Sequence, residues 1–259
     1  MELGIKGRRA IVCASSRGLG RACAVSLARE GVAVVINGRD DKTLSAAAEE
    51  IRSETGGDIT AVVADLDQSS DRDRLVAACP EADILVNNNG GPPPGRFEDW
   101  DQAAWLAALE SNLLAPTMMI RALLPGMKER RFGRIVNITS AMVKTPLAPM
   151  ALSTTARSGL TALCKALSKT AAPFNVTLNN LLPERIDTDR QVKMAEVVSK
   201  LGGISYEEAR AQQVASIAAG RLGLPEEVGD ACAFLCSAQA GFISGQNLQL
   251  DGGSYDGLI

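Results

Sequence analysis

The stretch Cys13-Ala14-Ser15-Ser16-Arg17-Gly18-Leu19-Gly20 closes a short apolar run at 9–14 and opens an alanine-rich, helix-patterned segment at 20–30. Small residues in such a turn let a pyrophosphate approach the backbone N–H groups at the helix N-terminus. A glycine-rich turn alone is a weak signal, but its position between a strand and a helix strengthens it. The stretch therefore predicts the first unit of a dinucleotide-binding sheet. Its predicted binding residues are Ser15, Ser16, Arg17, Gly18, Leu19 and Gly20.

The rest of the chain repeats this alternation of short apolar runs and longer helical segments, without a linker or an internal repeat. Continuous apolar runs are typical of buried parallel strands, and we predict strands at 9–14, 32–37, 59–64, 84–87, 134–139, 176–181 and 247–250. We predict helices at 20–30, 42–54, 69–78, 100–124, 156–172 and 225–237. The fold class is therefore α/β: a single domain over 1–259 with a Rossmann-like, doubly wound parallel sheet in a three-layer αβα sandwich. The polar segment 188–220 is either a substrate lid or an inert surface insertion.

The composition excludes several classes of function. The chain has 259 residues with no histidine, so it can form neither a Ser-His-Asp triad nor a His-ligated metal site, and we expect no metal. Thirty acidic against 27 basic residues leave no basic face for nucleic acid. No apolar run is long enough for a membrane span, so we expect a cytoplasmic protein whose six cysteines are reduced core residues.

The end of the second predicted strand suggests which dinucleotide is bound. Asn37-Gly38-Arg39 stands at the ribose-reading position, where an acidic residue would hydrogen-bond the 2′-hydroxyl of NAD. Arg39, with Arg17 nearby, could instead clamp a 2′-phosphate, which favours NADP over NAD. The alternative is two solvated arginines in surface loops.

The chain contains further short motifs, each present once: Asp65-Leu66, Asn87-Asn88-Asn89-Gly90, Asn112, Arg134-Ile135-Val136-Asn137-Ile138-Thr139-Ser140, Asn179 with Pro183 and Thr188, Gly220-Arg221-Leu222-Gly223 and Asp251-Gly252-Gly253. Together with the glycine-rich turn they resemble the short-chain dehydrogenase/reductase family, in particular bacterial 3-oxoacyl-acyl-carrier-protein reductases. The resemblance covers nearly the whole chain. It implies a small-molecule substrate and a homotetramer or dimer.

The resemblance also implies a role for individual residues. Asp65 and Leu66 would contact the adenine, and Asn88 and Gly90 would line the cofactor ribose. Pro183, Ile186 and Thr188 would hold the nicotinamide end. Asn112 would support a proton-relay water, and Ser140 would hydrogen-bond the substrate carbonyl.

The chain departs from the family pattern where the catalytic Tyr-x-x-x-Lys should stand, because Ser153 and Arg157 occupy those positions. A serine hydroxyl cannot be tuned into a proton donor as a phenol can, and it stops roughly 4 Å short of the phenol oxygen. A water is one way to fill that gap. Arg157 keeps the positive charge but, with a pKa above 12, is expected not to release a proton in turnover.

Other departures concern the two ends of the crevice. Ala14 replaces a glycine, and it would be strained if the turn needs a positive φ. Asn89 replaces an alanine, and Glu184, followed by Arg185, replaces a glycine after Pro183. Glu184 is either a base near the nicotinamide end or one half of a surface ion pair with Arg185 or a neighbour.

A displaced phenol would have to be one of the chain's two tyrosines, Tyr206 and Tyr255. Lys144, four residues after Ser140, is either a substitute cation for the pocket or a solvated loop lysine.

Three functions remain open on these grounds. The first is an NADP-dependent oxidoreductase of a small carbonyl or alcohol, relaying its proton through water held by Ser140, Asn112 and Ser153. The second is a non-redox lyase, dehydratase or isomerase of an anionic small molecule, with Arg157 as the anion clamp, Glu184 as the base and Arg185 beside it in the substrate site. The third is a catalytically silent scaffold that binds the cofactor. We expect the first.

Overall fold

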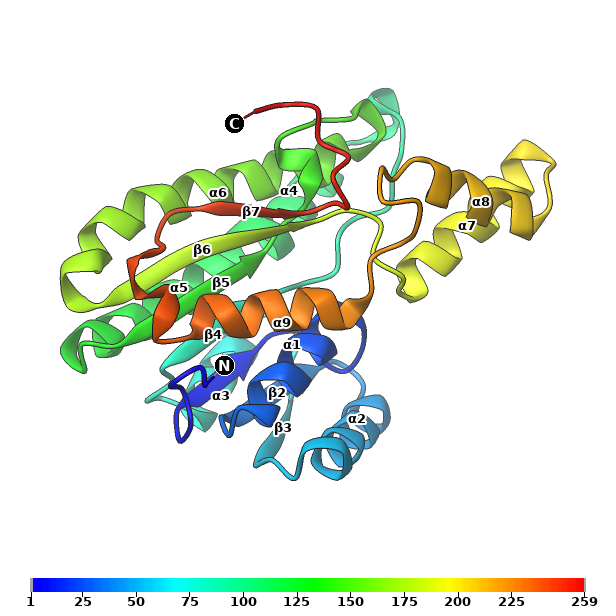
Figure 1. Cartoon of the computed structure of the whole chain (residues 1–259). Helices are drawn as coiled ribbons and strands as arrows, with labels where there is room; N and C mark the ends of the chain where they lie inside the picture. The colour runs from blue at the N-terminus through cyan, green and yellow to red at the C-terminus, as the bar shows by residue number, and fades with distance from the viewer. Residues whose placement is uncertain (1, 259) are drawn as a thin grey trace.

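The computed structural model describes residues 2–258 and contains a seven-stranded parallel sheet in the order β3-β2-β1-β4-β5-β6-β7 (Figure 1). The strands are β1 (Arg9–Val12), β2 (Ala33–Gly38), β3 (Ile59–Val63), β4 (Ile84–Asn87), β5 (Gly133–Ile138), β6 (Val176–Pro183) and β7 (Asn247–Leu250). All seven predicted strands are confirmed within a few residues. The order reverses between β1 and β4, which in a doubly wound sheet places a ligand crevice beyond the carboxyl ends of these two strands.

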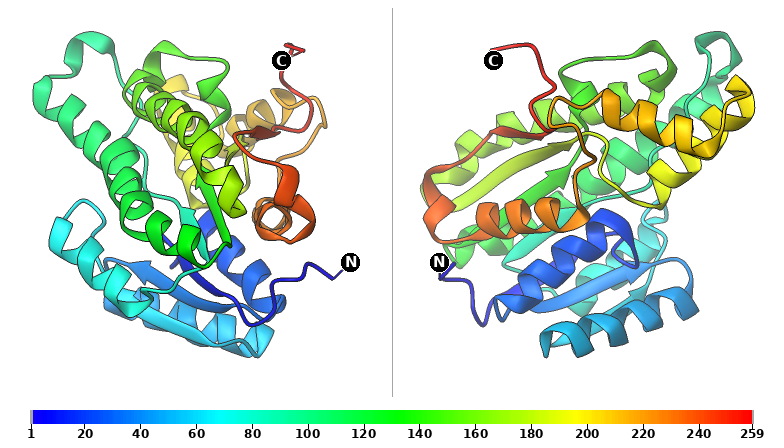
Figure 2. Two further views of the ribbon diagram at one scale, coloured as in Figure 1. Left: turned by 90° about the vertical axis from the view of Figure 1, so that its left-hand side faces the viewer. Right: turned by 45° about the vertical axis from the view of Figure 1, so that its right-hand side comes forward.

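Helices cover both faces of the sheet, as the two views of Figure 2 show. One face packs against α1 (Gly18–Arg29), α2 (Asp41–Thr55) and α9 (Pro225–Cys236). The other packs against α3 (Ser69–Ala78), α5 (Ala115–Glu129) and α6 (Ala151–Ala171), with α4 (Gln102–Leu109) beside α6. Short 3₁₀ turns lie at Phe97–Asp99, Ala141–Val143, Ala148–Met150, Ala172–Phe174 and Gln239–Phe242. The sheet is thus buried between two apolar layers, and all six cysteines are free and buried, as predicted.

The single helix predicted at 100–124 is wrong. The chain forms α4, then a π-helical turn at Glu110–Leu114, and then α5, which continues to Glu129. Pro116 has no N–H and its ring crowds the carbonyl one turn back, which a local π-helical turn relieves. Pro125 does not end α5, because Met127 beyond it is fully buried in the core and holds the last turn in place.

Four asparagines, three of them buried, link the strands of the sheet from β4 to β7. Asn87 donates to Asn137 (2.9 Å), Asn137 donates to Asn180 (2.9 Å) and Asn180 donates to Asn247 (2.8 Å) through their side-chain amides. Buried polar groups that satisfy one another in this way favour one register of the strands. The ladder therefore fixes the relative positions of the strand ends that carry Asn88, Ser140 and Pro183.

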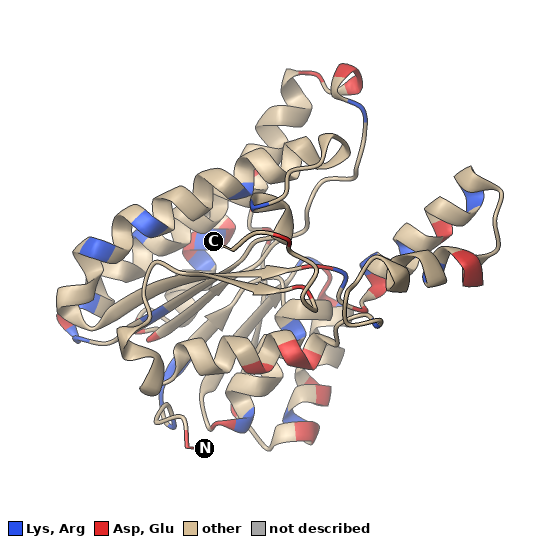
Figure 3. Ribbon diagram, turned by 45° about the horizontal axis from the view of Figure 1, so that its top comes forward, with Lys and Arg blue, Asp and Glu red and all other residues tan. Residues whose placement is uncertain are grey.

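The segment predicted as a lid or insertion forms two antiparallel helices, α7 (Asp189–Gly202) and α8 (Tyr206–Ala215), which project from the body (Figure 1). They pack mainly on each other. Basic and acidic residues are interspersed along the ribbon (Figure 3). No helix within residues 2–258 has the length and apolar character that crossing a membrane requires.

Candidate active site

The turn after β1 is held in a left-handed conformation. Ala14 has φ +45° and Gly18 has φ +57°. The Ala14 N–H donates to Asn37 Oδ1 (2.6 Å), and the Asn88 side-chain amide donates to the Ala14 carbonyl (3.1 Å). Ala14 is therefore strained, as the sequence predicted for a turn of this kind, and two asparagines from neighbouring strands hold it in place.

Gly20 lets α1 lie against this turn. A Cβ on Gly20 would stand 2.4 Å from the Ala14 carbonyl oxygen and 2.9 Å from Asn88 Nδ2. Neither atom can retreat, because the first is backbone and the second is held by its hydrogen bond to the first. The close approach of helix and turn therefore requires glycine at position 20.

The first turn of α1 is open to an anion. Arg17 precedes the helix in an extended conformation without a side-chain cap, and the first turn holds no acidic residue. Gly18 faces Thr188 across the crevice, since a Cβ there would lie 3.9 Å from Thr188 Cγ2. The Ser16 hydroxyl lies beside Gly38. The Ser15 hydroxyl instead turns inward, donating to the Val12 carbonyl and accepting from the Asn37 N–H. The Ser15 N–H donates to the Asn37 carbonyl and the residue is fully buried, so Ser15 shapes the turn and does not face a ligand.

Two exposed arginines stand near this end of the crevice. Arg17 makes one long ion pair, 3.9 Å, with Asp189 at the start of α7. Arg39 follows β2 and forms no ion pair with any described residue. Both guanidinium groups are thus available to a phosphate.

The loop after β3 borders the crevice on its other side. Leu66 is buried in the wall, while the Asp65 carboxylate accepts from the Asp67 N–H. Asn89 donates to Asp67 Oδ1 (3.1 Å) and to the Ser111 carbonyl (3.2 Å), so this side chain joins the β3 loop to the π-helical turn. Burial raises the pKa of Asp67, and the hydrogen bond from Asn89 partly offsets that rise.

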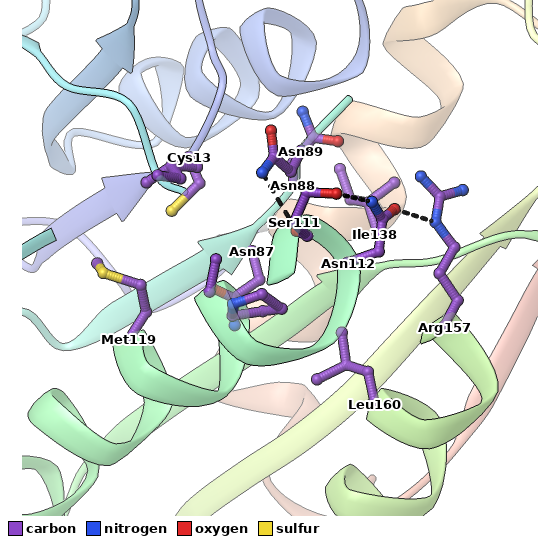
Figure 4. Close-up of a pocket in the computed structure, with 13 residues that line it drawn as sticks. Cys13, Asn87, Asn88, Asn89, Ser111, Asn112, Met119, Ile138, Arg157 and Leu160 are labelled. Carbon is purple, nitrogen blue, oxygen red and sulfur yellow. Dashed lines mark hydrogen bonds between the residues drawn. The ribbon is translucent and has the colours of Figure 1, made fainter. Parts of the chain in front are cut away.

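The centre of the site is a small cavity of about 20 Å³, room for about one water, walled by Asn88, Ser111, Asn112 and Arg157 among others (Figure 4). Asn112 lies in the π-helical turn and is buried. Its amide donates to the Gly90 carbonyl (3.2 Å) and to Ser111 Oγ (2.6 Å). Its Oδ1 accepts from Arg157 Nε (2.9 Å).

Arg157 reaches this cavity from α6 and anchors two elements. Besides Asn112, it binds the Thr139 carbonyl through Nη1 (2.8 Å). Burial and, secondarily, the charge of Arg190 lower the pKa of Arg157 to about 10. The expectation of a pKa above 12 is therefore wrong, because the guanidinium is desolvated and faces another cation. It stays protonated at neutral pH.

Ser140 and Ser153 lie beside Arg157. Ser140 lies two residues after β5, where it caps the 3₁₀ turn at Ala141–Val143 and accepts from the Met142 N–H through Oγ (3.2 Å). Ser153 is only 4% exposed, and its hydroxyl makes no hydrogen bond to any part of the described chain. Lys144 faces Tyr255, with Nζ 4.8 Å from the ring centroid.

The nicotinamide end predicted from the sequence lies after β6, where Pro183, the last residue of that strand, precedes a buried Ile186 that pairs with Gly223. Burial raises the pKa of Glu184, with the charge of Arg185 opposing this and that of Asp251 adding to it. No ion pair joins Glu184 to Arg185 within residues 2–258, so the surface ion pair considered as an alternative does not form. Arg185 has φ +48° and a buried Nε without a partner in the described chain.

Sequence reasoning missed Arg190. It lies in the first turn of α7 and donates from Nη1 to the Gly91 carbonyl and from Nη2 to the Pro92 carbonyl, 3.3 Å each. A basic residue near a helix N-terminus opposes the helix dipole. That unfavourable placement was the one signal in the sequence that could have marked it.

A model of the family described as enoyl-(acyl carrier protein) reductase matches residues 13–255 of this chain. The chain belongs to the short-chain dehydrogenase/reductase family. Among its relatives in this family, the NADPH-dependent reductase BacG of Bacillus subtilis is 31% identical over 97% of this chain and 99% of its own. The 3-oxoacyl-[acyl-carrier-protein] reductase FabG of Aquifex aeolicus is 33% identical over 98% of this chain and its full length.

Solved structures of the family share the fold throughout. The L-sorbose reductase from Gluconobacter frateurii, complexed with NADPH and L-sorbose, superposes with a TM-score of 0.94 at 27% identity, with 100% of each chain covered. The site described above therefore lies on a short-chain dehydrogenase/reductase scaffold.

The strained turn of this family member yields a stability prediction. Ala14→Gly is expected to raise the free energy of unfolding by about 1 kcal/mol, because glycine accepts φ +45° without the Cβ clash. Urea unfolding measures it. Ala46→Gly, at an exposed helical position, should cost about 1 kcal/mol instead. A lower free energy of unfolding in both Ala14→Gly and Ala46→Gly would show that the turn is not strained.

Proposed function

We propose that the chain is an NADP-dependent oxidoreductase of a small carbonyl or alcohol substrate, in which proton delivery does not use a tyrosine. The observation that carries the proposal is the turn at 13–20, which we call the nucleotide cradle. In it, Gly20 packs against the Ala14 carbonyl beside the uncapped N-terminus of α1. The NADPH dependence of BacG and the NADPH bound to the L-sorbose reductase support the same choice.

The cradle's residues fit such a cofactor. The backbone of 16–20 would hold the pyrophosphate, and Arg17 and Arg39 the 2′-phosphate. Asp65 and Leu66 would border the adenine, Asn88 and Gly90 the ribose, and Pro183, Ile186 and Thr188 the nicotinamide. The cofactor supplies or accepts a hydride when bound.

Proton delivery has to differ from the family pattern, because Ser153 and Arg157 stand where the resemblance expects tyrosine and lysine. Asn112 has both amide donors engaged and keeps one lone pair on Oδ1. A water in the neighbouring cavity would bind that lone pair. We propose that Ser140 holds the substrate oxygen, while Ser153 and this water carry the proton.

Nucleotide titration tests the proposal. We expect NADPH to bind more tightly than NADH, and Arg39→Ala to weaken NADPH about tenfold or more while leaving NADH unchanged, because one charge-assisted contact is lost. Nicotinamide fluorescence measures both. The control is Arg121→Ala, which removes another exposed arginine on α5.

Failure of both nucleotides to bind would overturn the redox proposal. The non-redox lyase or isomerase would then be the better account of the site.

We also propose that the protein is a homo-oligomer, dimer or tetramer. Phe234 on α9, Phe242 after it and Leu248 on β7 are exposed on the surface of the single chain. Apolar side chains gathered on the last helix and last strand of the sheet are typical of a surface that another subunit covers.

A further inference from the structure

Three hydrogen-bond donors converge on one point beside Gly91, in the loop after β4. A methyl group placed on Gly91 would lie 3.3 Å from Arg157 Nη2, 3.6 Å from Arg190 Nη1 and 3.6 Å from Ser153 Oγ. These are the three nearest heavy atoms outside the glycine and its neighbours. Two guanidinium groups and a hydroxyl thus lie against one side of the Gly91 backbone, where the Gly91 carbonyl accepts from Arg190 Nη1.

The charge at this point has no counterpart within the described chain. Neither Arg157 nor Arg190 forms an ion pair with an acidic residue in 2–258. Arg157 Nη2 has no hydrogen-bond partner there, although Nε and Nη1 are both bound. Arg190 is exposed, whereas Arg157 is partly buried, and a partly buried guanidinium is normally paired with a carboxylate.

Ser153 adds an independent observation. Its side chain is 96% buried and its hydroxyl is aimed at the same point, yet it finds no partner in the described residues. Ser153 Oγ is not among the fully buried side-chain atoms that lack a partner, so solvent reaches it and its hydroxyl is open to a ligand oxygen.

We propose that Arg157, Arg190 and Ser153 form a binding site for the carboxylate of a 2-oxo acid or 2-hydroxy acid substrate. That the bound carboxylate belongs to the reacting substrate rests on the proposed function. That the site binds a carboxylate does not. Guanidinium groups match the planar oxygens of a carboxylate. The cofactor's phosphates have their own site at the start of α1, so they do not explain donors beside Gly91.

The two projecting helices α7 and α8, here called the arm, supply part of this site. Arg190 lies in the first turn of α7 and is held over the loop by the carbonyls of Gly91 and Pro92. A bound carboxylate would therefore join α6 to the base of the arm, and carboxylate substrates would be favoured over neutral ketones of the same size.

Calorimetric titration of the whole protein with oxamate, without nucleotide, tests the site separately from the reaction. Oxamate is a planar analogue of a 2-oxo acid, and we expect a dissociation constant on the order of 1 mM, with no binding of its neutral counterpart oxamide. Arg190→Gln should weaken oxamate about tenfold or more, and Ser153→Ala a few-fold. Both changes leave the core packing intact, since Arg190 is exposed and Ser153 loses only a hydroxyl.

Lys193→Gln is the matched control, because it removes the same charge from an exposed position on the same helix. It should leave oxamate binding unchanged. Absence of oxamate binding, or an equal loss in Lys193→Gln, would overturn the site. Tighter binding of inorganic phosphate through the same residues would overturn the carboxylate assignment.

The two proposals fail separately. If the protein binds oxamate through Arg190 and Ser153 but binds no nucleotide, the carboxylate site is supported and the oxidoreductase proposal is rejected. NADPH binding without oxamate binding would do the reverse.

Discussion

Gly20→Ala should raise the dissociation constant of NADPH at least a hundredfold and lower the free energy of unfolding by about 1–3 kcal/mol. The new Cβ would stand 2.4 Å from the Ala14 carbonyl oxygen and 2.9 Å from the carbonyl carbon. Because these atoms are backbone, α1 would have to move away from the turn. That movement displaces the N–H groups that the pyrophosphate needs. Fluorescence titration and urea unfolding measure the two effects.

Gly202→Ala at the end of α7 is the control, because the nearest atom to its Cβ would lie at an ordinary 3.7 Å. NADPH binding should be unchanged there, and the free energy of unfolding should stay the same or rise slightly, because alanine favours a helix more than glycine does. Normal NADPH affinity in Gly20→Ala would mean that the cofactor, if bound, does not use this turn.

Arg157→Gln should lower kcat/KM for the best carbonyl substrate of a panel by roughly 10²–10³-fold. Arg157 holds Asn112 Oδ1 and the Thr139 carbonyl, and it directs a third nitrogen toward the point beside Gly91. Glutamine is too short to make all three contacts and carries no charge. We expect KM to rise, because one donor faces the substrate. We expect kcat to fall, because the other two donors position the catalytic residues. Steady-state NADPH oxidation measures it.

Arg157→Lys separates charge from geometry. A lysine keeps the cation but has no planar fork, so we expect it to restore only part of the lost rate. Arg121→Gln, on the outer surface of α5, should have no effect. Wild-type kcat/KM in Arg157→Gln would show that this arginine has no part in the reaction.

The site could be predicted from the sequence where function depends on local chain geometry. The turn at 13–20, the strain at Ala14 and the positions of Ser140 and Ser153 follow from motifs a few residues long. The partners of Asn112 could not be predicted, because they depend on a π-helical turn. Pro116 is visible in the sequence, but packing decides how a helix accommodates it.

By itself the sequence determined the alternation of strands and helices, the glycine-rich turn and the absence of histidine, since each is a property of neighbouring residues or of composition. The tertiary structure alone brought Arg190 to Ser153 and Arg157. Ser153 and Arg157 lie on α6 and Arg190 lies on α7, and they meet because α7 begins beside the loop that follows β4. Periodicity indicates which face of a helix is buried, whereas the packing of the folded chain decides which distant side chains share a point in space.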